Sequence, residues 1–151
     1  MDLGIKGKVA LVTGGSRGLG RQSALALAAE GVNVAICARG EGILNQTADE
    51  LKSTGVKVGA FVADLGDESG AADLVAKTEA ELGPIDILVN NVGGSLGTSD
   101  LVNSSLADFH MVMDANLWSA VALMKHVVPG MQKRGWGRVV NISSLAGLSG
   151  Q

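Results

Sequence analysis

The sequence predicts an α/β fold in which helices cover both faces of a doubly wound parallel sheet. Five short apolar runs lack the polar alternation of half-exposed strands, which is typical of strands buried on both faces. Segments with the apolar spacing of helices separate these runs. Right-handed crossovers turn such an alternation of strands and helices into one parallel sheet. We therefore expect a single domain over residues 1–151.

The expected strands are rich in valine, isoleucine, leucine and alanine. In chain order they are Lys8–Thr13, Val32–Ala38, Val56–Ala63, Ile85–Asn90 and Gly137–Ile142. Each of the first three is followed by a helix whose small and apolar residues recur every three or four positions. Those residues are Gly20, Ala24, Leu27, Ala28 and Gly31 in the first helix, Leu44, Ala48 and Leu51 in the second, and Ala71, Leu74, Val75, Thr78 and Leu82 in the third. This spacing predicts that each helix packs one face against the sheet.

The fourth helix is expected to be the longest, running from about Ser104 to Arg134. Its expected buried face consists of Phe109, Met113, Leu117, Ala120, Met124 and Val127. Proline and glycine interrupt helices, so the end of this one is expected near Pro129, Gly130 and Gly135.

Composition and charge exclude several classes of protein. The net charge is −3, so the chain lacks the basic field of nucleic-acid-binding proteins. Cys37 is the only cysteine, which excludes an internal disulfide and fits a reducing compartment; we expect it to be a small core residue. No apolar run has the length of a membrane span, and no basic segment followed by an apolar one marks a secretory signal. A soluble cytoplasmic protein is the expectation.

A glycine-rich loop follows the first expected strand and opens the first expected helix. The segment Thr13–Gly20 reads TGGSRGLG. A diphosphate bound there needs backbone N–H groups, no obstructing side chains and the positive end of a helix dipole. Gly14, Gly18 and Gly20 allow a tight turn, a close approach and a tight contact between helix and strand. This arrangement predicts a dinucleotide site to which Ser16, Arg17 and Leu19 also contribute.

The spacing Gly-x-x-x-Gly-x-Gly after a threonine resembles the short-chain dehydrogenase/reductase family, classical type. Asp64-Leu65 ends the third expected strand, where that family has an aspartate near the adenine. Asn90–Gly93, reading NNVG, is similar to the family's Asn-Asn-Ala-Gly. Asn116 lies on the long helix at the place of the family's structural and catalytic asparagine. Gly137–Gly147, reading GRVVNISSLAG, resembles the fifth strand and the loop that carries the catalytic serine.

This resemblance implies a Rossmann-like sheet with the strand order 3-2-1-4-5 and a hydride transfer between a nicotinamide and a carbonyl or alcohol substrate. The expected cofactor-binding residues are Gly14, Ser16, Arg17, Gly18, Leu19, Gly20, Arg39, Asp64, Leu65, Asn91 and Gly93. The expected catalytic residues are Ser144, which binds the substrate oxygen, and Asn116, which belongs to a proton relay. Asn116 also predicts an irregular or π-type turn in the long helix, because its amide competes for backbone hydrogen bonds.

The end of the second expected strand bears on the choice between NADP and NAD. Enzymes that prefer NAD usually have a carboxylate there, which accepts hydrogen bonds from the ribose 2′-hydroxyl. Ala38 takes that place and Arg39 follows it. A guanidinium binds a 2′-phosphate through charge-assisted hydrogen bonds, and Arg17 can join it. We therefore expect NADP(H), with NAD(H) kept as the alternative because Glu41 could accept a ribose hydroxyl.

Two questions about the chemistry stay open in the sequence. Ser144 is the expected substrate-binding serine, and its neighbour Ser143 is the alternative. The family's proton-transferring Tyr and its Lys are expected just after the serine, but the sequence contains no tyrosine and stops at Gln151. His110 and His126 are expected on helix surfaces rather than in a catalytic role. We therefore expect an incomplete domain, ending before the sixth strand, that is inactive by itself.

Three readings of the function follow from these features. The first is the cofactor-binding part of an NADP(H)-dependent oxidoreductase, which when complete acts on a small molecule as a homo-oligomer, without nucleic-acid or membrane partners. The others are a non-catalytic dinucleotide sensor and an assembly fragment with vestigial nucleotide binding. Retention of Asn116 and Ser144 favours the enzyme, since a sensor needs neither.

Overall fold

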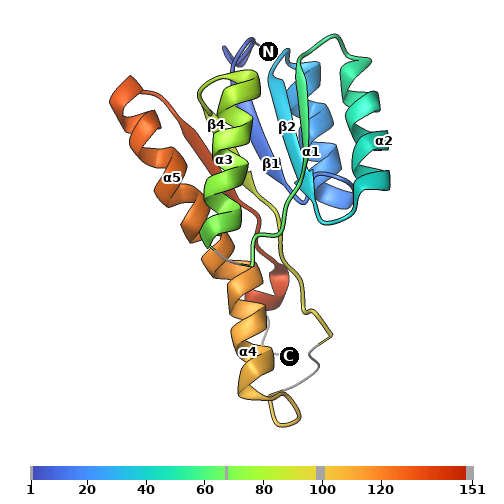
Figure 1. Ribbon diagram of the computed structural model, residues 1–151, viewed down its shortest axis with the longest axis vertical. Helices are drawn as coiled ribbons and strands as arrows, with labels where there is room; N and C mark the ends of the chain where they lie inside the picture. Colours follow the sequence, from blue (N-terminus) through green and yellow to red (C-terminus); the bar gives the residue numbers. More distant parts are fainter. Residues whose placement is uncertain (1, 67, 98–100, 149–151) are drawn as a thin grey trace.

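The computed structural model describes residues 2–66, 68–97 and 101–148 and confirms the expected sheet (Figure 1). Five strands form it in the order β3-β2-β1-β4-β5, and every neighbouring pair is parallel. The strands are β1 (Val9–Thr13), β2 (Asn33–Ala38), β3 (Val58–Val62), β4 (Ile87–Asn90) and β5 (Arg138–Asn141). Each lies inside the range expected from its apolar run, because the outer residues of each run belong to the adjoining turns.

Two helices cover each face of the sheet. The helices α1 (Gly18–Ala29) and α2 (Glu41–Lys52) pack on one face, and α3 (Glu68–Leu82) and α5 (Ser119–Arg134) pack on the other. Successive residues of a strand point to opposite faces, so Ala10 and Val12 join the first core while Leu11 joins the second. The buried positions of the first three helices are largely those that their spacing predicts.

The buried face predicted for the long helix holds at Val127, which is buried, and at Met124, which is partly buried against the core, but it is wrong at Phe109, Met113 and Leu117, which are exposed. The helix consists of α4 (Leu106–Met113), a π-helical turn at Asp114–Trp118, and α5. Figure 1 shows that α4 extends beyond the end of the sheet, and it has no buried residue. The wide turn also rotates the two halves relative to each other, so the buried residues of α5 are Ser119, Leu123, Val127 and Met131.

The long helix ends at Arg134, as expected, and its proline does not interrupt it. Pro129 is inside α5, which continues to Arg134 and closes at Gly135 with a φ of 70°. Glycine adopts this left-handed conformation without a steric penalty, which explains its place after the last turn.

The strand β5 is more exposed than its apolar sequence predicts. Val139 and Val140 are 37% and 45% exposed, whereas all four residues of β4 are buried. Within the described residues β5 pairs only with β4, so it forms one edge of the sheet.

None of the described helices is both long and apolar enough to cross a membrane. Cys37 is buried in the core, as expected, and burial raises the pKa of its thiol to about 11. The thiol therefore remains protonated near neutral pH, which suits a core residue and not a nucleophile.

Candidate dinucleotide and substrate site

The carboxyl ends of β1 and β4 are joined by a group of hydrogen bonds between Thr13 and Asn91. The Asn91 side-chain amide donates to the carbonyl oxygens of Thr13 (3.1 Å) and Gly14 (3.3 Å). The Thr13 hydroxyl oxygen accepts from the backbone N–H groups of Asn91 (2.9 Å) and Val92 (3.1 Å). These bonds hold the glycine loop beside the loop after β4. This is the point at which the strand order reverses, where doubly wound sheets bind their ligands.

Glycine is required in these loops for two different reasons. A Cβ on Gly20 would collide with the Gly14 carbonyl and the Asn91 amide, and one on Gly93 would lie 2.5 Å from Asn116 Oδ1. Gly18 instead has a φ of 57° with no atom within 4 Å of a Cβ position. Gly20 and Gly93 therefore let protein segments approach one another. Gly18 instead allows the positive φ, and the empty space around its Cβ position leaves the outer side of the loop open.

The beginning of α1 presents the features of an anion site. Arg17 precedes the helix in an extended conformation, and its side chain does not cap the helix. The first backbone N–H groups of a helix have no partner within it and lie at the positive end of the dipole. Ser16 is partly buried, whereas Arg17 and Leu19 are exposed beside this end. A diphosphate can therefore be bound by backbone groups at this point.

Two exposed arginines, Arg17 and Arg39, lie in this loop and just after β2. Arg39 follows β2, whose end is tied to the loop by a hydrogen bond from Gly15 N to Cys37 O (3.0 Å). Within the described residues, neither the Arg17 nor the Arg39 guanidinium forms an ion pair or a hydrogen bond. Arg21 differs, because its guanidinium binds the Glu50 carboxylate on α2 at 2.5–3.0 Å.

The two residues expected near the adenine have different surroundings. Asp64 is exposed, and its carboxylate accepts a hydrogen bond from Gly66 N at 3.0 Å. Leu65 is only 6% exposed and packs in the core. Any contact of Leu65 with a ligand must therefore involve mainly its backbone.

Asn116 connects the long helix to the loop after β4. Its Oδ1 accepts from Gly94 N (2.9 Å), and its Nδ2 donates to the carbonyl oxygens of Gly94 (2.9 Å) and Val112 (2.8 Å). The expected irregularity is confirmed by the π-helical turn at Asp114–Trp118. Ser119 N donates to Asp114 O, and the Ser119 hydroxyl donates to Ala115 O at 2.7 Å. The serine therefore satisfies a carbonyl that the widened turn leaves without its usual helical donor.

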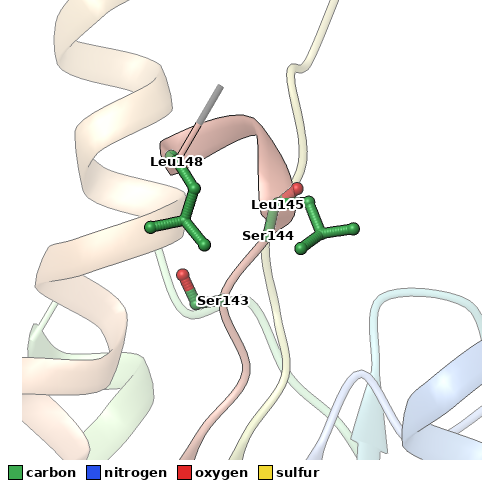
Figure 2. A pocket seen from close by; sticks show the side chains of 5 residues that line it. Ser143, Ser144, Leu145 and Leu148 are labelled. Carbon is green, nitrogen blue, oxygen red and sulfur yellow. The ribbon is translucent and has the colours of Figure 1, made fainter. Parts of the chain in front are cut away.

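The serine loop, which is the segment after β5 that carries Ser143 and Ser144, starts beside Asn90 at the end of β4. Asn90 Nδ2 donates to Asn141 Oδ1 (2.8 Å), and Ile142 N donates to Asn90 O (2.9 Å). Figure 2 shows that the two serine hydroxyls after this point lie on different sides of the chain, with Ser143 toward Leu148. Ser144 precedes the 3-10 helix Leu145–Gly147, and its Oγ accepts from Ala146 N at 3.2 Å.

Both serines line a hollow together with Leu145, Gly147 and Leu148.

A model of the short chain dehydrogenase family matches residues 8–151. The chain belongs to the short-chain dehydrogenase family. The family that the sequence motifs indicate is therefore confirmed.

The relatives of this chain include proteins named as reductases and dehydrogenases. The ketoacyl reductase HetN of Nostoc sp. is 40% identical over 146 residues, which are 97% of this chain and 50% of the relative. A putative ketoacyl reductase of Streptomyces coelicolor is 39% identical, over 95% of this chain and 55% of the relative. The chain thus spans about half the length of these relatives.

Solved structures show the same fold. An NAD⁺-bound xylitol dehydrogenase has a TM-score of 0.90 at 31% identity, covering 97% of this chain and 56% of that one. A 7α-hydroxysteroid dehydrogenase complexed with NADH and 7-oxo glycochenodeoxycholic acid has a TM-score of 0.92 at 31% identity, covering 97% and 57%.

Two polar residues near the site were not predicted from the sequence. Asn141 bonds to Asn90 across the strands, and Thr47 on α2 donates from its hydroxyl to Ser16 O at 2.9 Å. Asn141 lies within the segment Gly137–Gly147 but received no role of its own, Thr47 belongs to no motif, and both partners are distant in the sequence. Only the parallel register of β4 and β5 could have suggested the asparagine pair, because it places Asn141 directly beside Asn90.

Proposed function

We propose that this chain is the cofactor-binding part of an NADP(H)-dependent oxidoreductase acting on the carbonyl or alcohol group of a small molecule. The observation that carries the choice of cofactor is the pair of exposed guanidiniums, Arg17 and Arg39, that lack a partner within the described residues. A dianionic 2′-phosphate can bind both through charge-assisted hydrogen bonds. Ala38 leaves no carboxylate at the end of β2 to repel it.

The glycine loop and its neighbours fit a dinucleotide on the evidence of their geometry. The open side of the loop at Gly18 and the uncapped beginning of α1 can hold the diphosphate through backbone N–H groups. Asp64, the backbone of Leu65 and Asn91 lie on the adenosine and diphosphate side in this proposal, and Asn91 is bonded to the glycine loop itself. When bound, the nicotinamide supplies the hydride acceptor or donor.

In this proposal, residues of the chain bind and orient the substrate. The Ser144 oxygen already accepts from Ala146 N, so its hydrogen can be donated to a substrate oxygen. Asn116 holds the π-helical turn against Gly94 and acts as a positioning residue. We further propose that residues 1–151 alone are inactive, because the proton-transferring phenol expected from the family is not among them.

Replacing Arg39 by alanine is expected to weaken NADP(H) binding by about one to two orders of magnitude and to leave NAD(H) binding nearly unchanged. The reason is that a hydrogen bond to a charged group contributes about 1.5–3 kcal/mol. The measurement is the Kd of each dinucleotide for the complete protein and the variant. A matched Glu41→Ala variant tests the alternative, since a ribose hydroxyl bound by Glu41 would make NAD(H) binding weaker there. Equal weakening of both cofactors by Arg39→Ala would contradict the proposed specificity.

A further inference from the structure

Thr47 uses its hydroxyl in an unusual way for a threonine inside a helix. It lies in the middle of α2, is 3% exposed, and donates to Ser16 O at 2.9 Å. Serine and threonine in helices commonly bond to a carbonyl of the preceding turn. Thr78 in α3 does so, donating to Leu74 O at 2.8 Å, and Ser119 likewise donates to Ala115 O at 2.7 Å. Thr47 instead joins its helix to a loop 31 residues away.

The Thr47 bond determines the orientation of one peptide group in the glycine loop. The Ser16 carbonyl and the Arg17 N–H belong to the same planar trans peptide and point in opposite directions. By holding the carbonyl toward α2, Thr47 turns the Arg17 N–H away from that helix. It therefore constrains the backbone from which the Arg17 side chain projects.

The same bond also relates Arg17 to Arg39. The helix α2 begins at Glu41, two residues after Arg39, so its position governs where that arginine lies. A second link runs parallel to the first, because Arg21 on α1 binds Glu50 on α2. Thr47 and this ion pair thus connect the segment carrying Arg17 to the helix that follows Arg39.

We propose that Thr47 is a positioning residue for cofactor specificity, holding Arg17 and Arg39 at a separation that a single 2′-phosphate can bridge. The inference rests on the proposed function and deepens it. NAD(H) has no 2′-phosphate and needs only the diphosphate site. That site is also held by the contact of Gly20 with Gly14 and Asn91, which does not involve Thr47. Loss of the Thr47 hydroxyl therefore acts mainly on NADP(H).

The test measures the Kd of NADP(H) and NAD(H) for the complete protein and its variants by titration calorimetry. Thr47→Val removes the hydroxyl at nearly constant volume, and Thr47→Ser keeps it. We expect Thr47→Val to weaken NADP(H) binding about 3- to 10-fold, the size of one net hydrogen bond, and NAD(H) binding by less than about 2-fold. Thr47→Ser is expected to keep most of the wild-type ratio between the two Kd values.

Two further variants separate positioning from general loss of stability. Thr78→Val removes a buried hydroxyl of the same kind from α3 and is expected to lower Tm without changing the ratio of Kd values. Thr47→Ala replaces Thr47→Val if the latter fails to fold, because alanine is the best helix former. Its expected ratio is the same as that of Thr47→Val.

The outcomes distinguish the two proposals. A wild-type protein that prefers NAD(H) overturns the proposed cofactor and this inference with it. A wild-type preference for NADP(H) that Thr47→Val and Thr47→Ala leave intact overturns the role of Thr47 alone. Equal weakening of both cofactors by these variants also overturns it, since it would show a structural effect on the whole loop.

Discussion

Residues 1–151, purified by themselves, are expected to show no measurable reductase turnover. Loss of an acid–base group alone typically lowers a rate by about 10²–10⁴-fold, and a loss of substrate positioning adds to this. Among the residues that the structure describes, none is expected to replace the missing phenol near Ser143 and Ser144. His110 and His126 are exposed on the long helix, and the exposed Lys125 lies 3.5 Å from the Glu68 carboxylate.

The measurement is NADPH oxidation with a panel of aldehydes and ketones, run beside a form of the protein as long as its relatives. Circular dichroism and dinucleotide titration of the 151-residue chain serve as controls for folding and for the cofactor site. Weak binding without turnover is the expected result. Turnover at a rate comparable to that of the longer form would mean that one of the three side chains named above transfers the proton.

Ser144→Ala in the complete protein is expected to lower kcat by about 10²–10³-fold. This is the usual effect of removing one hydrogen-bond donor from the oxygen on which charge develops. The physical reason is that the Ser144 hydroxyl accepts a hydrogen bond from Ala146 N and keeps its own hydrogen available for donation to the substrate oxygen. The measurement is kcat and KM with saturating NADPH, and Ser144→Thr is the variant that keeps a hydroxyl.

Ser143→Ala is the matched control for that substitution. Figure 2 shows the Ser143 hydroxyl on a different side of the loop from that of Ser144. Because it then makes no hydrogen bond to the substrate oxygen, its removal is expected to change kcat by less than a factor of about three. The reverse order of effects would assign the substrate oxygen to Ser143 and contradict the role proposed for Ser144.

The sheet could be predicted from the sequence because each strand carries its own local signal. The uninterrupted apolar runs at Val9–Thr13 and Ile87–Asn90 lie at the centre of the sheet, where both faces are covered. The π-helical turn was also predictable, since Asn116 competes for backbone hydrogen bonds and here bonds to Val112 O within the helix. The order of the strands required the resemblance to a family. Apolar runs show where strands lie in the sequence but not which strands are neighbours in the sheet.

The parts that escaped prediction depend on contacts between distant residues. The buried face of the long helix was misjudged because a regular period was carried through the wide turn, and because nothing in Phe109 or Met113 shows that α4 lies beyond the sheet. The Thr47 bond to Ser16 joins segments 31 residues apart, and a threonine in a helix is ordinary by sequence. The glycine loop was the opposite case, since its conformation is encoded by Gly14 and Gly18 themselves.

Transfer of hydride from NADPH to a carbonyl carbon is the most direct test of the central claim. The complete protein is incubated with NADPH deuterated at nicotinamide C4, on either face in separate reactions, and with the same panel of aldehydes and ketones. Mass spectrometry then follows the label. The account predicts that one face delivers deuterium to the former carbonyl carbon of at least one substrate, and that NADH does so less efficiently. Tight binding of NADPH with no transfer from either face to any substrate, and none from NADH, would contradict the account and favour a dinucleotide sensor.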